Sequence, residues 1–371
     1  MTESNEIRAC YAWLASSCMP SAMMCTLLDT YSNPEGIYRA FRQRDKSLNA
    51  LVPPRFFRLL EQNGSTEKML KYAEIMKRNQ IHCLCISDQS YPATLQTIPD
   101  PPAILFYQGN MAVMNCRAVA MVGSRKASYS GIKASKKLAA DLSRNGITVI
   151  SGLACGIDAA AHLGCIEGGS PTLAVTGGGL DIVYPKDNQP LRDEILCKGG
   201  LILSEYAPGE RPAGWHFPVR NRIITGLACA LILIEARIRS GSMTSVQHAL
   251  DQGKDIFVYP GDPSSVYYEG NHQLLREGAI YFTSAEDILA DLDWLDNPGC
   301  VRQNSDCLTG QPAHSPEEQA VLNALHPGSL HFEELLNRTG LDASVLMTCL
   351  TMLQISGSVE ALPGKQYQLR H

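Results

Sequence analysis

Residues 118–123 read AVAMVG, five apolar residues that end in a glycine. Five further apolar runs follow along the chain, three of them ending in glycine: GITVISG (146–152), PTLAVTG (171–177), GLILSEY (200–206), ALILIEA (230–236) and DIFVYPG (255–261). Helical stretches separate the runs, and strands that are apolar on both faces are typical of a parallel sheet covered by helices. The sequence therefore predicts an α/β fold built on a parallel sheet.

Composition changes along the chain predict three domains and one linker. Helical, turn-rich patterns occupy residues 1–80, ahead of the sheet domain over residues 81–295. The segment 296–315, DNPGCVRQNSDCLTGQPAHS, has no apolar periodicity and is rich in Asn, Gly, Pro and Ser, as linkers are. Three short helical patterns and a hairpin that turns at Pro363 and Gly364 follow, an order that predicts a winged helix over residues 316–371.

Composition also restricts the class of protein. With 371 residues, 45% of them hydrophobic and 19% charged, the chain is typical of a soluble multi-domain protein. No run approaches the ~18 apolar residues of a membrane span, and Glu3 and Glu6 stand where a signal peptide needs positive charge. The 13 cysteines include no C-x-x-C pair, which favours reduced, buried thiols. We therefore expect a cytoplasmic protein.

The net charge of −5 hides a local excess of cations. Residues 117–239 contain 15 Lys or Arg and 10 Asp or Glu, whereas the rest of the chain contains 17 and 27. Because the local charge sets the field that a ligand meets in a cleft, the central segment is suited to an anion even though the whole protein is acidic.

Four of the predicted strands end in small residues. Ligands of open α/β sheets bind outside the carboxyl ends of the strands, and small residues there allow a phosphate to approach backbone N–H groups and helix N-termini. The four ends are Gly123-Ser124-Arg125, Gly152 to Gly156, Gly177-Gly178-Gly179 and Ser240-Gly241-Ser242. Together they predict an anion site.

Missing motifs limit which anion this is. No stretch matches G-x-x-x-x-G-K-[ST], and VGSRKASYSG does not match G-x-G-x-x-G, so neither nucleotide hydrolysis nor a dinucleotide cofactor is predicted. The strand ends instead offer Arg125, Lys186 and the pair Arg220 and Arg222, with aromatic residues close to that pair. Cations spaced along a groove beside aromatic rings favour single-stranded nucleic acid.

Three acids also stand near strand ends, namely Asp158, Asp181 and Glu235. Paired carboxylates hold metals or serve as acid and base, but at such positions they more often cap helices or pair with Arg. We predict neither a metal site nor a catalytic residue.

Eight motifs in order carry a resemblance to a known family: MVGSR, SGLACGIDAAAH, TGGGLDIVYPKDN, LSEY, FPVRNRIITGL, EARIRSGSMT, VYPGDP and EGNHQLLREGA. The chain resembles the DprA/Smf family of DNA-processing proteins, densely over residues 90–290 and loosely elsewhere. The resemblance implies a cytoplasmic protein of natural transformation that binds and protects single-stranded DNA and helps load RecA onto it. It also implies an extended Rossmann-like core that forms a homodimer, an N-terminal domain like a sterile-alpha-motif fold and a C-terminal winged helix.

Carried over by position, the family's DNA pocket falls on the GSR turn, the glycines of the next strand end, the YPK stretch and the RNR stretch. These residues are Gly123, Ser124, Arg125, Gly152, Gly156, Lys186, Arg220, Asn221 and Arg222. Residues 220 and 222 of a helix point about 200° apart, so one arginine should line the groove while the other pairs with an acid. We expect Arg222 to line the groove, or Arg220 if the chain is still extended there.

Two other functions are compatible with parts of the sequence. The lysine-decarboxylase-like phosphoribohydrolases have a related fold, but their catalytic glutamate is absent from the corresponding RSGSMT stretch. A duplex-DNA regulator would use the winged helix, yet residues 312–371 carry three cations and six acids, and DASVLMTCLTMLQIS has no Lys or Arg. That domain therefore favours a protein contact. The basic and aromatic residues of the N-terminal domain, from Tyr38 to Arg58, fit either DNA or a solvated helix face.

Overall fold

The computed structural model describes residues 3–294, 316–325, 330–355, 359–362 and 366–369. It contains two compact units, residues 1–301 and 302–371, which are described separately. The predicted linker, 296–315, lies outside the described residues. Among the described residues, no helix has both the length and the apolar character needed to cross a bilayer.

A nine-stranded sheet forms the centre of the first unit. Its strands are β1 (His82–Cys85), β2 (Ile104–Gly109), β3 (Ala118–Val122), β4 (Thr148–Ser151), β5 (Leu173–Thr176), β6 (Leu201–Ser204), β7 (Ala230–Leu233), β8 (Asp255–Val258) and β9 (Ile280–Tyr281). The six apolar runs form β3 to β8, and the parallel sheet is confirmed. Of the nine strands, β2 alone runs opposite to the others, since it pairs antiparallel with both β1 and β6.

The strand order is β1-β2-β6-β5-β4-β3-β7-β8-β9. The part β5-β4-β3-β7-β8-β9 has the Rossmann order, which β6, β2 and β1 extend at one edge. The chain leaves β3 toward β4 on one side and returns to β7 on the other, so the topological switch point lies between β3 and β7. The extended Rossmann-like fold is therefore confirmed.

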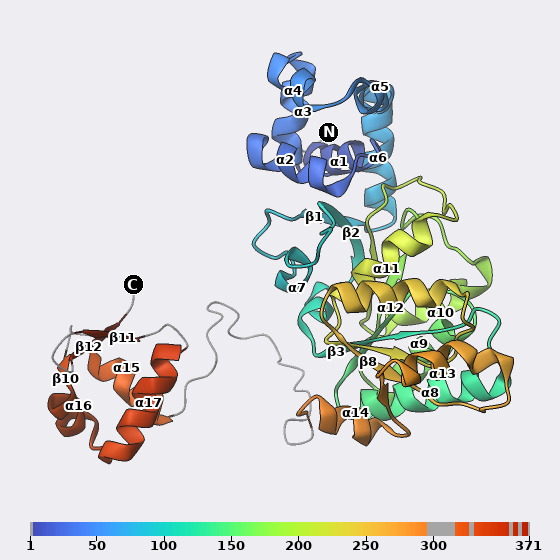
Figure 1. Cartoon of the computed structure of the whole chain (residues 1–371). Coiled ribbons are helices and arrows are strands. Elements are labelled where there is room, and N and C mark those ends of the chain that lie inside the picture. Colours follow the sequence, from blue (N-terminus) through green and yellow to red (C-terminus); the bar gives the residue numbers. More distant parts are fainter. Residues whose placement is uncertain (1–2, 295–315, 326–329, 356–358, 363–365, 370–371) are drawn as a thin grey trace. The chain divides into compact units, whose positions relative to one another are not determined.

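Helices cover both faces of the sheet (Figure 1). The helices that follow β1 in the chain are α7 (Ala93–Gln96), α8 (Tyr129–Arg144), α9 (Ile157–Gly168), α10 (Gln189–Cys197), α11 (His216–Gly226), α12 (Gly241–Asp251), α13 (Glu269–Arg276) and α14 (Ala285–Asp291). Side chains of β7 alternate between the faces: Leu231 packs in the cluster that includes α11 and α12, and Ile232 packs in the cluster that includes α8, α9 and α14. This alternation buries every residue of β7.

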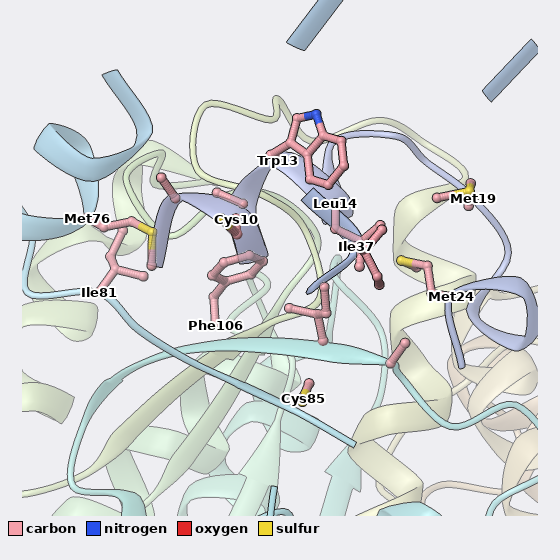
Figure 2. Close-up of a cluster of buried hydrophobic side chains, with 14 of the residues drawn as sticks. Cys10, Trp13, Leu14, Met19, Met24, Ile37, Met76, Ile81, Cys85 and Phe106 are labelled. Carbon is pink, nitrogen blue, oxygen red and sulfur yellow. The ribbon is translucent and has the colours of Figure 1, made fainter. Parts of the chain in front are cut away.

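Six helices precede the sheet: α1 (Glu3–Ala15), α2 (Ser21–Tyr31), α3 (Pro34–Arg42), α4 (Lys46–Leu51), α5 (Pro54–Asn63) and α6 (Thr66–Arg78). Trp13 is buried at their centre, and its indole N–H donates to the carbonyl of Leu60 at 2.9 Å. The same hydrophobic cluster includes Phe106 of β2 and Ile202 of β6. Figure 2 shows Trp13 and Phe106 in this shared core. The helical segment thus packs on the sheet, and its boundary at residue 80 stays a prediction.

The second unit contains the predicted helices and hairpin. Its elements are α15 (Pro316–Leu325), β10 (Leu330–His331), α16 (Phe332–Thr339), α17 (Ala343–Ile355), β11 (Val359–Leu362) and β12 (Gln366–Leu369). β12 pairs antiparallel with both β10 and β11, which gives the sheet of a winged helix. The predicted turn at Pro363 and Gly364 lies outside the described residues.

The thiols only partly follow the prediction of reduced, buried cysteines. Among the cysteines that the structure describes, Cys10, Cys85, Cys165 and Cys349 are buried. Cys18, Cys155, Cys197 and Cys229 are exposed instead, because they lie in loops or at the ends of elements.

Candidate nucleic-acid interface

A cleft of about 780 Å³ opens at the switch point, beside the carboxyl ends of β3 and β7. This is the position where open α/β sheets bind their ligands. Four cations and one carboxylate line the cleft: Arg125, Lys126, Arg220, Arg237 and Asp158. The predicted residues Gly123, Ser124 and Asn221 line it as well. Its charge therefore suits an anion, as the local cation excess predicts.

The turn after β3 is held by backbone contacts. The amide of Ser124 donates to the carbonyl of Glu235 at 2.8 Å, and the carbonyl of Ser124 accepts from the amide of Ile157 at 3.2 Å. Gly156 precedes α9 with φ +80°, and a Cβ there would collide with the carbonyl oxygen of Ser124. The glycine therefore permits two loops from different strand ends to pack backbone against backbone. Gly156 itself lines neither the cleft nor the cavity beside it.

Arg125 lies exposed at the mouth of the cleft. Its guanidinium carbon is 4.5 Å from the centroid of the Phe217 ring, which in turn lies 5.6 Å from the ring of Tyr184. Together with Gly152, these residues line a second cavity of about 250 Å³. A cation above aromatic rings is the combination that binds a phosphate and a stacked base side by side.

Arg220 lines the cleft from α11, although only 3% of it is exposed. Its guanidinium donates to the carbonyls of Gly152, at 2.9 Å, and of Val175. A Cβ on Gly152 would lie 2.5 Å from Arg220 Nη2 and 2.6 Å from Asp158 Oδ2, so only glycine leaves room for both groups. Burial lowers the pKa of Arg220 to about 10, against the opposing effect of Asp158, and the group stays charged at neutral pH.

The expectation that Arg222 lines the groove is wrong. Its side chain is 6% exposed and donates to both oxygens of Glu205, at 2.6 and 2.9 Å, and to Oδ2 of Asp100 at 3.0 Å. The carboxylates of Glu205 and Asp100 raise the pKa of Arg222 against the effect of burial. The two arginines do point in different directions, as predicted, but it is Arg220 that lines the cleft and Arg222 that pairs with acids. Arg220 already lies within α11, and the helix turns its side chain toward the strand ends.

The three strand-end acids bind backbone or hydroxyl groups. Asp158 accepts from the amides of Gly152 and Ala154, at 3.2 and 3.4 Å, and burial raises its pKa while Arg220 opposes that rise. Glu235 is buried and accepts from the amide and hydroxyl of Ser128, the residue that caps α8. Asp181 accepts from the amide of Gly209 at 2.7 Å. These carboxylates support the loops around the cleft.

Lys186 begins a short 3-10 helix, Lys186–Asn188, and its side chain is exposed. It lines neither cavity, whereas its neighbours Tyr184 and Pro185 line the smaller one. Residues of the cleft wall that sequence reasoning missed include Lys126, Arg237, Tyr267 and Ser245. Arg237 lies 4.9 Å from the ring of Tyr267. Lys126 adjoins the GSR turn and Arg237 follows a strand end, so their closeness in sequence to these motifs could have identified both as residues of the cleft.

The basic and aromatic residues of the N-terminal helices separate into two layers. The ring of Phe41 lies 5.1 Å from that of Trp13 and 5.7 Å from that of Phe57, so these aromatics pack together. Arg39 and Arg42 are exposed, and Arg39 pairs with Glu35 at 3.1 Å.

Fold and cleft together define an extended Rossmann-like protein with a cation-lined cleft at its switch point and a C-terminal winged helix. The chain belongs to the DNA recombination-mediator protein A family, whose model matches residues 82–293. A second model, the DprA winged helix domain, matches residues 309–365.

Relatives and solved structures agree with this assignment. The chain is 44% identical over 209 residues to the DNA processing protein DprA of Streptococcus pneumoniae, covering 56% of this chain and 73% of that protein. It is 33% identical over 307 residues to protein Smf of Escherichia coli, covering 78% of each. The X-ray structure of S. pneumoniae DprA matches with a TM-score of 0.64 and 36% identity, covering 75% of this chain and 95% of that one. A Helicobacter pylori DNA processing protein A structure, described for its single-stranded DNA binding mode, matches with a TM-score of 0.52 and 28% identity, covering 57% of this chain and 95% of that one.

Proposed function

We propose that this protein binds single-stranded DNA in the switch-point cleft and does so without catalysis. The observation that carries the proposal is the wall of the cleft, where Arg125, Lys126, Arg220 and Arg237 face a single carboxylate. The aromatic rings of Phe217 and Tyr184 beside Arg125 offer surfaces on which bases stack. The related H. pylori protein, described for binding single-stranded DNA, supports this ligand.

Membership of the family supports a proposal for the cellular role. We propose that the protein acts in the cytoplasm during natural transformation, where it protects incoming single strands and helps load RecA onto them as a homodimer. The winged helix would then contact a protein, because α17 carries no Lys or Arg and leaves Met347 and Met352 more than half exposed.

The test is a comparison of single-stranded and duplex oligonucleotides of one sequence by fluorescence anisotropy. We expect tighter binding of the single strand. Arg125→Ala and Lys126→Ala should each weaken binding equally for all sequences, because both residues line the cleft and phosphate contacts carry no base information. Each should also reduce the slope of log affinity against log salt by about 0.7. Arg144→Ala, an exposed residue in the last turn of α8 and at the opposite end of that helix from the cleft, is the matched charge control. Unchanged affinity and slope in both variants would exclude this site.

A nucleotide-processing enzyme is the alternative outcome. The cleft has room for a nucleotide, but the first turn of α12 carries no acidic residue to serve as the catalytic group. Incubation with nucleoside monophosphates should release no free base, and turnover would replace the binding function with an enzymatic one. Duplex affinity above single-strand affinity would instead indicate a regulator that acts through the winged helix.

A further inference from the structure

The N-terminus of α12 forms one wall of the cleft, and its hydrogen-bond donors are unused. Ser240 has the extended backbone of an N-cap residue, with φ −125° and ψ 156°, yet its hydroxyl caps nothing. Its Oγ is buried without a hydrogen-bond partner. Ser65, Ser128 and Ser284 cap their helices in the usual way. Among the described residues, the amides of Gly241 and Ser242 have no partner either.

Two further serines stand one turn apart on the same wall, and their hydroxyl oxygens, unlike Oγ of Ser240, keep contact with the open cleft. Ser242 is 8% exposed and Ser245 is 1% exposed, and both line the cleft. Neither side chain has a hydrogen bond within the part of the chain that the structure describes. Buried hydroxyl groups are normally bonded to protein or to a ligand. Three unbonded serines on one wall of one cleft therefore indicate a ligand.

The donors specify the chemistry of that ligand. Three hydroxyls and two backbone N–H groups surround the positive end of an 11-residue helix, and Arg237 lies on the same cleft. Helix N-termini bind anions, and a tetrahedral group with several oxygens satisfies five donors better than a planar carboxylate does. We propose that Ser240, Ser242 and Ser245 hold a phosphate at α12, a second phosphate site across the switch point from Arg125.

The source of the phosphate rests on the proposed function. A phosphodiester within a bound strand and a terminal phosphomonoester, on a strand or a free nucleotide, share the chemistry that these donors recognise. The phosphomonoester has three free oxygens and a higher negative charge than the phosphodiester. Probes that carry one kind or the other distinguish the two.

The test uses the full chain and the double variant Ser240→Ala, Ser242→Ala. Its affinity should fall at least about tenfold, because hydrogen bonds to charged groups are among the strong ones. The salt slope should not change, since serine neutralises no phosphate, whereas Arg237→Gln should reduce it by about 0.7. The Tm should also hold, because neither hydroxyl bonds the protein. Ser284→Ala is the matched control: it removes a capping bond of α14, so Tm falls while affinity is kept.

Three probes separate the sources: thymidine 5′-monophosphate, and an oligothymidylate with either a 5′-hydroxyl or a 5′-phosphate. Weaker binding of both oligonucleotides supports a phosphodiester site, and weaker binding of the mononucleotide and the 5′-phosphorylated strand alone supports a terminal one. If wild type binds only the mononucleotide, and does so through these serines, the phosphate site stands while the proposed function fails. An NMR shift of the Ser242 amide on adding the mononucleotide tests the site without any variant. Affinities unchanged by the substitutions, or a Tm that falls with them, would overturn the proposal.

Discussion

Replacing Arg222 with Gln should destabilise the protein while leaving its cleft intact. The guanidinium connects α11 to Glu205, just beyond β6, and the two side chains are 6% and 13% exposed. Removing one partner of a buried ion pair costs about 3–5 kcal/mol, because the other charge stays buried and unpaired. Gln keeps one donor toward Glu205, and Asp100 is 55% exposed and easily solvated, so the loss should lie near 3 kcal/mol, the lower end of that range. At ~2–4 °C per kcal/mol, Tm should fall by roughly 6–12 °C.

Differential scanning fluorimetry and anisotropy with single-stranded DNA measure the two effects separately. Arg39→Gln, which removes an ion pair with side chains 68% and 43% exposed, should change stability by less than about 0.5 kcal/mol. The double variant Arg222→Met, Glu205→Leu should recover most of the lost stability, because an apolar pair carries no desolvation cost. Arg220→Gln should lower both DNA affinity and stability, because the buried guanidinium lines the cleft and also bonds the carbonyls of Gly152 and Val175 beside Asp158. An Arg222→Gln protein that melts within about 2 °C of wild type, or that loses DNA as Arg220→Gln does, would refute this reasoning.

Three other outcomes follow from the structure. Burial, with the nearby charge of Arg220, lowers the pKa of His162 to about 3. Below about pH 6.5 the unfolded chain therefore binds a proton at this residue that the folded chain does not bind. The stability due to His162 is intact above that pH and declines below it by about 1.4 kcal/mol per pH unit. His162→Asn should flatten Tm against pH between about 6 and 4, and an unaltered profile would contradict the assignment. Bound single-stranded DNA should protect Cys155, which lines the smaller cavity, from a thiol reagent, whereas the exposed Cys229 just before β7, at the opposite end of the strands, should keep reacting; mass spectrometry of the labelled peptides measures both. Deleting residues 312–371, which are net negative, should leave single-strand affinity within a few-fold of the full chain, and a hundredfold loss would show that the winged helix binds DNA.

Local sequence patterns were enough to predict the elements and the end of the sheet where the cleft lies. Apolar runs that end in glycine predict buried parallel strands, because backbone geometry and burial act over neighbouring residues. The same local logic indicated Gly123, Ser124 and Arg125 as part of an anion site, and the structure places all three on the cleft. Family motifs in a fixed order supplied the assignment to DNA processing.

Which side chains face that cleft became clear only from the packing of the elements. Arg220 and Arg222 are both arginines of one helix, and nothing local distinguishes them: the rotation of α11 on the sheet turns Arg220 to Gly152 and Arg222 to Glu205. Arg237 joins the cleft because β7 pairs with β3 across more than a hundred residues of chain. Likewise, the unbonded state of Ser240 and Ser242 depends on which groups come near them in space. Contacts between distant segments depend on how whole elements pack, and no local pattern encodes that packing.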